Sequence, residues 1–452
     1  MSGLSNNGSN STRLQVLTFV MTIEYNGFEY AGFQRQTATH IDTSSSNQQH
    51  RPNKKAKKSK RSSSTIQHEI EMALQKYTNL SIATLRVRGA GRTDKGVHAT
   101  GQVVAFDIPI KLLNMDNDDC KCHEDINDEE GGTNNKEIIS EHCMKHIQDA
   151  YHILNTYMST TNASTADNEK KNTFVDLWQI RRALSTRLPT DIVIRSIRLY
   201  TDLYNPFEPR KRIQCKTYVY KLRFRCLSYL NDDDESSINE KQLASTSDNN
   251  THQQQLESSD TRDQAQLHPI CNSGPHLLRR VNDQNAVWLC QWPLNPSLLH
   301  QACNMFIGKH DFVNFVHKDE RKKIESKDAD DTTSNVAEDT SDHAIDLFEF
   351  SVDIQSEEEE DKSLPPVMNA TFTLKAKGFH RSMVRMLVGF VVDVARGKQS
   401  LEDIPILLLD KKEEDGMNIS LTAETLNSLK VHAAPACGLC LANVEYEHNN
   451  FL

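Results

Sequence analysis

Long polar stretches interrupt this 452-residue sequence and confine any folded core to the blocks between them. Only 37% of the residues are hydrophobic and the mean hydropathy is −0.61, values that are low for a compact chain of this length. We therefore expect a disordered N-terminal tail and long disordered insertions. The tail covers residues 1–13, and the insertions cover about 37–63, 114–172, 231–276, 318–343 and 356–364.

The blocks between the insertions show strand and helix patterns in mixed order. Residues 14–27 alternate apolar and polar side chains before an Asn-Gly turn, which predicts a strand. Residues 64–78 place apolar side chains on one helical face after a Ser/Thr start signal, and residues 139–158 could form a helix inside an insertion. The absence of a regular βαβ alternation favours an α+β fold over a doubly wound sheet. Further strand and helix patterns lie at 174–200, 215–226, 296–315 and 369–398.

The net charge of −10 is unevenly distributed along the chain. Three windows together carry −16, so the remainder carries +6. Because phosphate binding depends on local charge, this distribution is compatible with a nucleic-acid partner if the acidic loops lie away from its surface. The three windows are Asp116–Glu130, Asp232–Glu235 and Glu357–Asp361.

No apolar run approaches the roughly 18 residues that a membrane span needs, so we expect no membrane partner. The N-terminus has no secretory pattern, which favours a cytoplasmic or nuclear protein and leaves an organellar address open. The basic run Lys54–Arg61 (KKAKKSKR) has three interpretations: a nuclear localisation signal, an RNA-contacting arm or a solvated loop.

Ten cysteines are scattered without regular spacing, and we expect them to be reduced thiols. Cys437 and Cys440 form a C-x-x-C pair on an expected strand, where a redox or zinc site is the minor interpretation. Cys120, Cys122 and His123 lie in an acidic loop, where any bound metal would be adventitious. The sequence therefore predicts no metal site.

The segment Gly89–Asp107 (GAGRTDKGVHATGQVVAFD) carries the strongest functional signal. Its glycines allow tight turns and a close approach of the backbone to a ligand. Arg92 and Asp94 flank Thr93 at a spacing that can direct both side chains into one site, where an arginine would keep a carboxylate ionised. The alternative is a surface turn with an exposed ion pair. His98 is interpreted as a structural hydrogen-bonding residue of the loop.

The same segment resembles the signature AGRTDxGVHAxGQV of the TruA family of tRNA pseudouridine synthases. The resemblance implies that Asp94 is the catalytic aspartate and Arg92 its motif partner. Thr22–Gln36 is similar to the family's opening strand, and Leu188–Ile197 is similar to its LPxDIxV block.

Three further blocks resemble the family and add candidate site residues. Phe207–Leu222 is similar to FHARxSAxxKxYxY and implies functional positions at Arg210 and Tyr218. Lys377–Gly389 is similar to xxFLxxMVRNIVG, and Ala434–Leu441 to APPxGLxL. These blocks imply an active-site arginine at Arg385 and a leucine near the target base at Leu439. The chain departs from the family pattern at Glu208, where the family has histidine, and at His380–Ser382.

The resemblance implies a pseudouridine synthase fold with a central, mostly antiparallel mixed sheet and flanking helices. It implies two halves, 14–200 and 201–452, around one basic cleft with a continuous sheet. The implied activity converts uridine to pseudouridine in tRNA, at positions 38–40 of the anticodon arm, without metal or cofactor.

In that reaction the resemblance gives each site residue a role. Asp94 is the nucleophile, Tyr218 stacks on the base, Arg385 pairs with Asp94 and Arg210 contacts phosphate or a neighbouring nucleotide. The minor alternative for Tyr218 is a core strand tyrosine.

Three alternatives stay open: a synthase acting at other tRNA positions, an inactive RNA-binding or tRNA-folding protein of the same fold, and a glycoside- or nucleoside-cleaving hydrolase. The hydrolase would need a second carboxylate, which the motif lacks. Bacterial members of the family are dimers, so a homodimer is also open.

Overall fold

The computed structural model describes several blocks of the chain. None of the helices in the described blocks is long and apolar enough to cross a membrane. The described residues are 15–35, 64–113, 138–161, 177–227, 278, 283, 285–317, 344–357, 365–408, 429–447 and 451.

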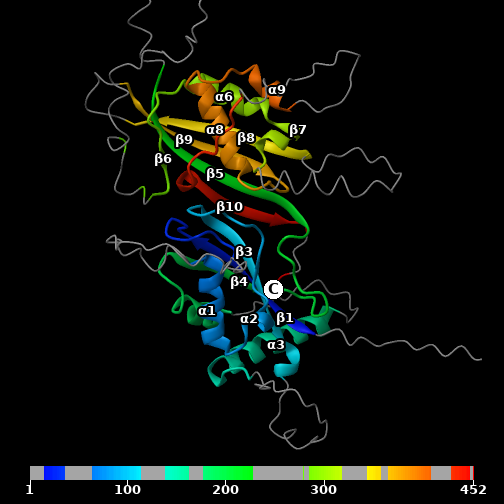
Figure 1. The fold of residues 1–452 in the computed structure, drawn as a ribbon. Helices are drawn as coiled ribbons and strands as arrows, with labels where there is room; N and C mark the ends of the chain where they lie inside the picture. The colour runs from blue at the N-terminus through cyan, green and yellow to red at the C-terminus, as the bar shows by residue number, and fades with distance from the viewer. Residues whose placement is uncertain are drawn as a thin grey trace, which may run out of the picture. The chain divides into compact units, whose positions relative to one another are not determined.

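Contacts divide the chain into two compact units. The family resemblance implies a boundary between the two halves at 200/201. The first unit contains residues 1–214 and 442–452, and the second contains residues 215–441. Two strands cross this boundary: β5 (Ile213–Arg225) enters the second unit, and β10 (Leu439–Tyr446) returns to the first. Figure 1 shows the elements of each unit.

Three long antiparallel strands of the first unit lie in the order β4–β1–β3, with β10 next to β3, and a short strand, β2, also pairs with β3. The central strand β1 is mostly apolar, and its side chains are buried or half-buried on both faces of the sheet. Phe19 on β1 lies opposite Phe106 on β3, and their rings stack with centroids 5.0 Å apart. The strands are β1 (Val16–Tyr25), β2 (Arg88–Gly89), β3 (His98–Pro109) and β4 (Ile192–Leu199).

Helices of the first unit pack around α1, which contacts α2, α3 and α4. The Thr65 side chain caps α1 by accepting the amide of His68, and the apolar face predicted for this helix is buried. Residue Asn79 ends α1 in the left-handed conformation. The helices are α1 (Ile66–Thr78), α2 (Ile82–Leu85), η2 (Ile110–Leu112), α3 (Glu141–Thr161) and α4 (Trp178–Ser185).

The second unit has an antiparallel sheet in the order β5–β9–β8–β7, with β6 parallel to β5. Helices α6 and α8 pack against each other, and α6 also contacts β8 and α9 (Figure 1). The other elements are β6 (Trp288–Leu289), α6 (Pro296–Met305), β7 (Gly308–Asp311), η7 (Val313–Phe315), β8 (Ala344–Ser356), β9 (Val367–Ala376), α8 (Met383–Ala395), α9 (Asp403–Leu408) and η8 (Ala436–Gly438).

These elements confirm an α+β fold with mostly antiparallel pairing, one parallel pair and flanking helices. The pattern at 296–315 predicts an amphipathic helix that stops at Gly308; α6 ends at Met305, close to that stop, and Gly308, with φ +116°, begins a strand.

Helix α3 bears out the helix considered at 139–158, but this part of the segment 114–172 is not a disordered insertion. Cys143, Ile147 and Leu154 of α3 are buried at 0–1% exposure, so this helix belongs to the core. Most of the remaining predicted insertion residues, including Lys54–Arg61 and Cys120–His123, lie outside the described residues.

Candidate active site

Asp94 and Arg92 lie on the loop that joins β2 to β3. Thr93 between them is buried, whereas Asp94 is half-buried and Arg92 is exposed. The loop turns back at Asp94, whose carbonyl accepts the amide of Val97 at 3.2 Å, and Gly96 has φ +80° in this turn. Motif residues therefore alternate between anchoring the loop and presenting polar side chains.

Gln102 on β3 fixes the beginning of this loop. Its side-chain amide donates to the carbonyl of Gly91 at 2.9 Å, and its side-chain oxygen accepts the Gly91 amide at 3.3 Å. Gln102 is fully buried, so water does not compete for these hydrogen bonds. The glutamine of the GQV segment thus acts on the backbone three residues before Asp94.

The segment after β1 fixes the middle of the loop. Phe33 donates its amide to the Thr93 carbonyl at 3.1 Å, and the hydroxyls of Tyr25 and Thr93 share a hydrogen bond of 2.8 Å. Gly32 has φ +112°, and a Cβ atom there would lie 2.8 Å from the Thr93 carbonyl oxygen. A glycine is therefore required for this close approach.

His98 and Gly27 fix the end of the loop. The Gly27 amide donates to Nδ1 of His98 at 3.3 Å, and His98 is 7% exposed. This contact confirms that His98 is a structural hydrogen-bonding residue. A Cβ atom on Gly27 would overlap the carbonyl oxygen of Val97, so the two segments pack backbone against backbone.

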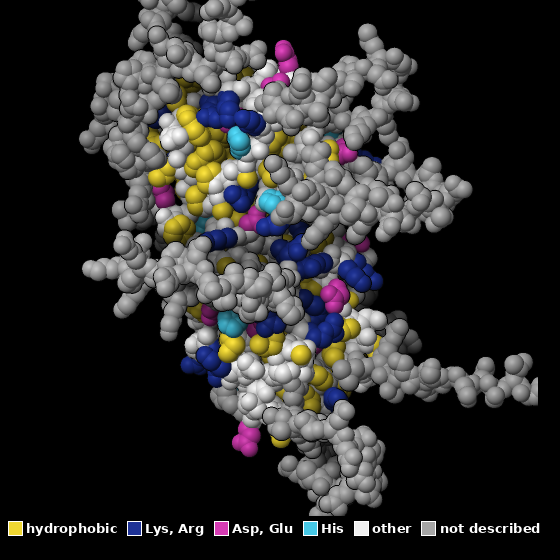
Figure 2. All heavy atoms as spheres, in the orientation of Figure 1, with side chains coloured by type: hydrophobic (Ala, Val, Ile, Leu, Met, Phe, Trp, Pro, Cys, Tyr) yellow, Lys and Arg dark blue, Asp and Glu magenta, His cyan; other side chains and the backbone are white. Residues whose placement is uncertain are grey.

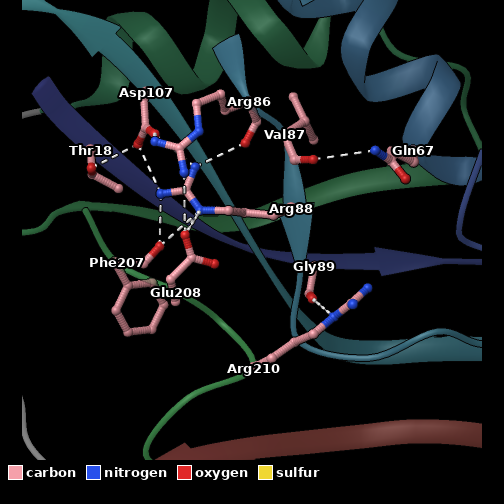
Figure 3. Close-up of polar contacts among 10 residues, drawn as sticks. All are labelled: Thr18, Gln67, Arg86, Val87, Arg88, Gly89, Asp107, Phe207, Glu208 and Arg210. Carbon is pink, nitrogen blue, oxygen red and sulfur yellow. Dashed lines mark hydrogen bonds and ion pairs between the residues drawn. The ribbon is translucent and has the colours of Figure 1, made fainter. Parts of the chain in front are cut away.

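Arg210 is an exposed residue whose Nε donates to the Gly89 carbonyl at 3.3 Å, immediately before the Asp94 loop. Figure 3 shows this contact beside a cluster of charged residues that the sequence analysis did not identify: Arg86, Arg88 and Asp107, together with Glu208, which it noted only as a departure from the family pattern. The signal was present as two arginines two positions apart, Arg86 before β2 and Arg88 on it, and an acid on the apolar strand β3.

In the second unit, Tyr218 lies on β5 opposite Leu374 and is 9% exposed. Its ring meets Phe379 edge-on, with centroids 5.2 Å apart and an interplanar angle of 87°. Arg385 lies in the first turn of α8, and its Nε donates to the Ala434 carbonyl at 2.7 Å. The amide of Ala434 donates to the carbonyl of Arg385 at 2.8 Å, so two hydrogen bonds join the start of α8 to the segment at Ala434.

Leu439 is 6% exposed and begins β10 directly after η8. The turn before it packs on Tyr220, whose hydroxyl donates to the Pro435 carbonyl at 2.8 Å. Burial raises the pKa of Tyr220 and keeps its hydroxyl protonated, while the nearby charge of Arg385 acts in the opposite direction. A Cβ atom on Gly438 would lie 2.6 Å from the Tyr220 ring.

The predicted site residues thus belong to two units. Arg92, Asp94 and Arg210 lie in the first, whereas Tyr218, Arg385 and Leu439 lie in the second. The ion pair between Asp94 and Arg385 stays a prediction.

The seven cysteines within the described blocks are free thiols, as predicted. Burial raises the pKa of Cys437, and the Arg385 charge only partly offsets this effect, so Cys437 is a weak nucleophile at neutral pH. Among the described residues, no group of three or more His, Cys, Asp or Glu side chains could hold a metal ion.

Comparisons with known proteins give one consistent family. A family model for tRNA pseudouridine synthase matches residues 302–447. The chain is 24% identical over 393 residues to tRNA pseudouridine synthase A 1 of Bacillus cereus, covering 87% of this chain and 90% of the relative. It is 23% identical over 388 residues to tRNA pseudouridine synthase A of Thermodesulfovibrio yellowstonii, covering 85% and 87%. A shorter match of 91 residues reaches 36% identity with tRNA pseudouridine synthase A of Streptococcus pneumoniae, covering 20% and 26%.

Proposed function

Because this chain belongs to the TruA family of tRNA pseudouridine synthases, we propose that it is an isomerase that converts uridine to pseudouridine in tRNA with Asp94 as nucleophile. The observation that carries the proposal is the loop around Asp94. Two segments hold its backbone: β3 through Gln102 and His98, and the segment after β1 through Gly27 and Phe33, while Asp94 itself stays half-buried. Fixed backbone with an accessible carboxylate is the arrangement that a positioned nucleophile needs.

The proposed reaction breaks the N1–C1′ bond of uridine and forms a C5–C1′ bond. N1 gains a proton and C5 loses one, so the atoms and electrons of substrate and product balance without a redox partner. Positive charge develops at C1′ when the glycosidic bond breaks, and a carboxylate can stabilise or capture that carbon. Asp94 supplies this group.

The target base must leave its stack before it can react, which gives roles to the residues of the second unit. We propose that Tyr218 stacks on the extruded base and that Leu439 packs beside it. Arg385 is proposed to pair with Asp94 and keep it ionised, because a guanidinium favours the charged form of a nearby carboxylate. Arg92 and Arg210 supply positive charge on the first unit, where a phosphate group would be attracted.

We further propose that the target lies in the anticodon arm at positions 38–40, on the basis of the amino-acid sequence of the segment Gly89–Asp107. A synthase with other tRNA targets and an inactive tRNA-binding protein are the competing functions. We also propose a cytoplasmic or nuclear location and leave homodimer formation to a measurement of mass in solution.

The decisive assay is tritium release from tRNA labelled at C5 of uridine. We expect the wild-type protein to release tritium and Asp94→Asn to lose activity by roughly 10³-fold or more while still binding tRNA. Asp149→Asn is a matched control, because this carboxylate lies on the exposed surface of α3, and it should retain wild-type activity.

The assay separates the alternatives. Equal activity of wild type and Asp94→Asn would remove Asp94 from the chemistry, and tRNA binding without activity in the wild type would favour the binding protein. Mapping the product by primer extension after carbodiimide treatment would identify the modified positions. Product outside positions 38–40 would contradict the anticodon-arm assignment.

A further inference from the structure

Arg88 on β2 makes an unusually complete set of contacts for a side chain beside the proposed site (Figure 3). Its Nη1 and Nη2 donate to the two carboxylate oxygens of Asp107 at 2.8 and 2.9 Å. Its Nε and Nη2 donate to the Phe207 carbonyl at 3.0 and 2.8 Å, and Nε lies 3.1 Å from the Glu208 carboxylate. Only a planar guanidinium offers donors in this forked arrangement.

Asp107 is the fixed point of the cluster. It is fully buried on β3, accepts the Thr18 hydroxyl at 2.8 Å, and lies 3.3 Å from Nη1 of Arg86. A buried ion pair is weak evidence for stability, because desolvation offsets much of its attraction, but it can fix one geometry among several. Here the pair holds the Arg88 side chain in one orientation toward the segment at Phe207 and Glu208.

The part held is the turn Glu208–Arg212, whose Lys211 amide donates to the Glu208 carbonyl at 2.9 Å. Glu208 links the turn to Arg88, and also to Arg86 at 3.5 Å. Arg210 binds the Gly89 carbonyl, so the turn is attached to β2 at two points.

The far end of this turn is attached to the C-terminal strand. The Tyr446 hydroxyl donates to the Pro209 carbonyl at 2.8 Å, and the Glu447 amide donates to the Arg212 carbonyl at 3.2 Å. Arg212 has φ +56°, which only a well-supported turn maintains in a residue with a side chain.

Charge within the cluster is balanced, and charge on the turn is not. Arg86 and Arg88 neutralise Asp107 and Glu208, whereas Arg210 and Lys211 are exposed and have no ion-pair partner among the described residues. On the face of the first unit drawn in Figure 2, acidic side chains are few beside Lys and Arg. The turn therefore presents two cations next to the strand that leads into the Asp94 loop.

We propose that Arg88, acting through Glu208, is a positioning residue that holds this turn so that Arg210 and Lys211 contact phosphates of the tRNA beside the target uridine. The inference rests on the proposed function and extends it to residues outside the family signature. Arg88 does not touch the substrate. Its effect is transmitted through the attachment of the turn to β2, which continues directly into the loop that carries Asp94.

The test is a double-mutant cycle between Glu208→Ala and Arg210→Ala. Glu208→Ala removes the ion pairs of the turn with Arg86 and Arg88, and so loosens its attachment to β2, but leaves the buried Arg88–Asp107 pair intact. The protein should therefore fold with a melting temperature near that of the wild type. We expect it to raise the KM for tRNA about tenfold with kcat within about twofold, because a uniform binding contact is lost. In the Arg210→Ala background the same change should raise the KM less than twofold further.

Two more variants test the phosphate contact and Arg88 itself. Lys211→Ala should lower the slope of log Kd against log salt by roughly one unit, whereas Lys111→Ala, an exposed lysine on η2, should leave it unchanged. Arg88→Lys retains the charge but not the fork, and we expect its KM to match that of Glu208→Ala.

Equilibrium binding of tRNA to the same variants makes the outcome independent of catalysis. An unchanged Kd and KM in Glu208→Ala, or additive effects of Glu208→Ala and Arg210→Ala, would overturn the positioning role. If tRNA binding by the wild type and the variants shows the expected coupling but the wild type releases no tritium, only the proposed function is overturned. A protein that does not bind tRNA would overturn both.

Discussion

Gln102→Leu should separate the folding of the Asp94 loop from the rest of the first unit. Leucine has a similar volume and fits an apolar strand, but it cannot bind the Gly91 backbone. The substitution removes hydrogen bonds of 2.9 and 3.3 Å and leaves an amide and a carbonyl without these partners. Gln102 and Gly91 are both buried, so water cannot readily replace them.

The expected cost follows from these two groups. Each buried group left unsatisfied costs about 1–3 kcal/mol, and relaxation of a loop offsets part of this, so we expect Gln102→Leu to lower the free energy of unfolding by about 2–4 kcal/mol. The catalytic effect should fall mainly on kcat, by on the order of ten- to a hundredfold, because a misplaced nucleophile affects the transition state more than tRNA binding.

Urea denaturation and hydrogen exchange measure the two parts of this prediction. Amides of residues 90–97 should exchange faster in Gln102→Leu, whereas amides of α8 in the second unit should not change. Gln148→Leu is the control, since its side chain makes a single 3.2 Å hydrogen bond, to Leu113. Unfolding free energies within about 0.5 kcal/mol of the wild type, together with unchanged exchange in the loop, would refute the reasoning.

Three other substitutions or conditions test the structure. Gly27→Ala should cost about 1–3 kcal/mol in thermal denaturation because its Cβ overlaps a loop carbonyl, whereas Gly378→Ala, with no atom within 4 Å, should be neutral. The raised pKa of Cys437 should make its alkylation at pH 7.5, followed by mass spectrometry, slower in the folded than in the urea-unfolded protein; equal rates would contradict its burial. Burial also raises the pKa of Tyr446, so its contribution to stability is complete below the unfolded value of about 10 and is lost as pH rises above it. Tyr446→Phe should therefore show a shallower loss of stability above about pH 10, and identical slopes would count against this assignment.

Local elements of the fold followed from short-range patterns. The apolar face of α1, its Thr65 cap and the strand β1 could all be predicted, because hydrophobic spacing and capping residues act between close neighbours in sequence. Helix α3 was considered from the sequence, but its place in the core was not predicted, because polar segments on both sides obscured its buried face. Gly308 indicated the end of α6, but the short strand that begins there was not predicted.

The candidate site followed from the sequence only in part. The signature identified the loop with Arg92 and Asp94, but not the reason for Gln102 in the same signature. The sequence gives the residue type at position 102 but not the direction of its side chain. Only that direction distinguishes a glutamine that binds the loop backbone from one that merely packs in the core. Glu208 was noted only as a departure from a family pattern, although it holds the Arg210 turn to β2.

The sequence by itself determined the α+β class, the local elements and the loop that carries the proposed nucleophile, because these depend on residue spacing and backbone preferences over a few positions. Only the tertiary structure determined the partners of that loop. Gln102 binds a backbone 11 residues away, and Arg88 binds Asp107 and Phe207 at separations of 19 and 119 residues. Many arginines and acids could pair by charge alone, and burial together with the directionality of hydrogen bonds selects the few that do.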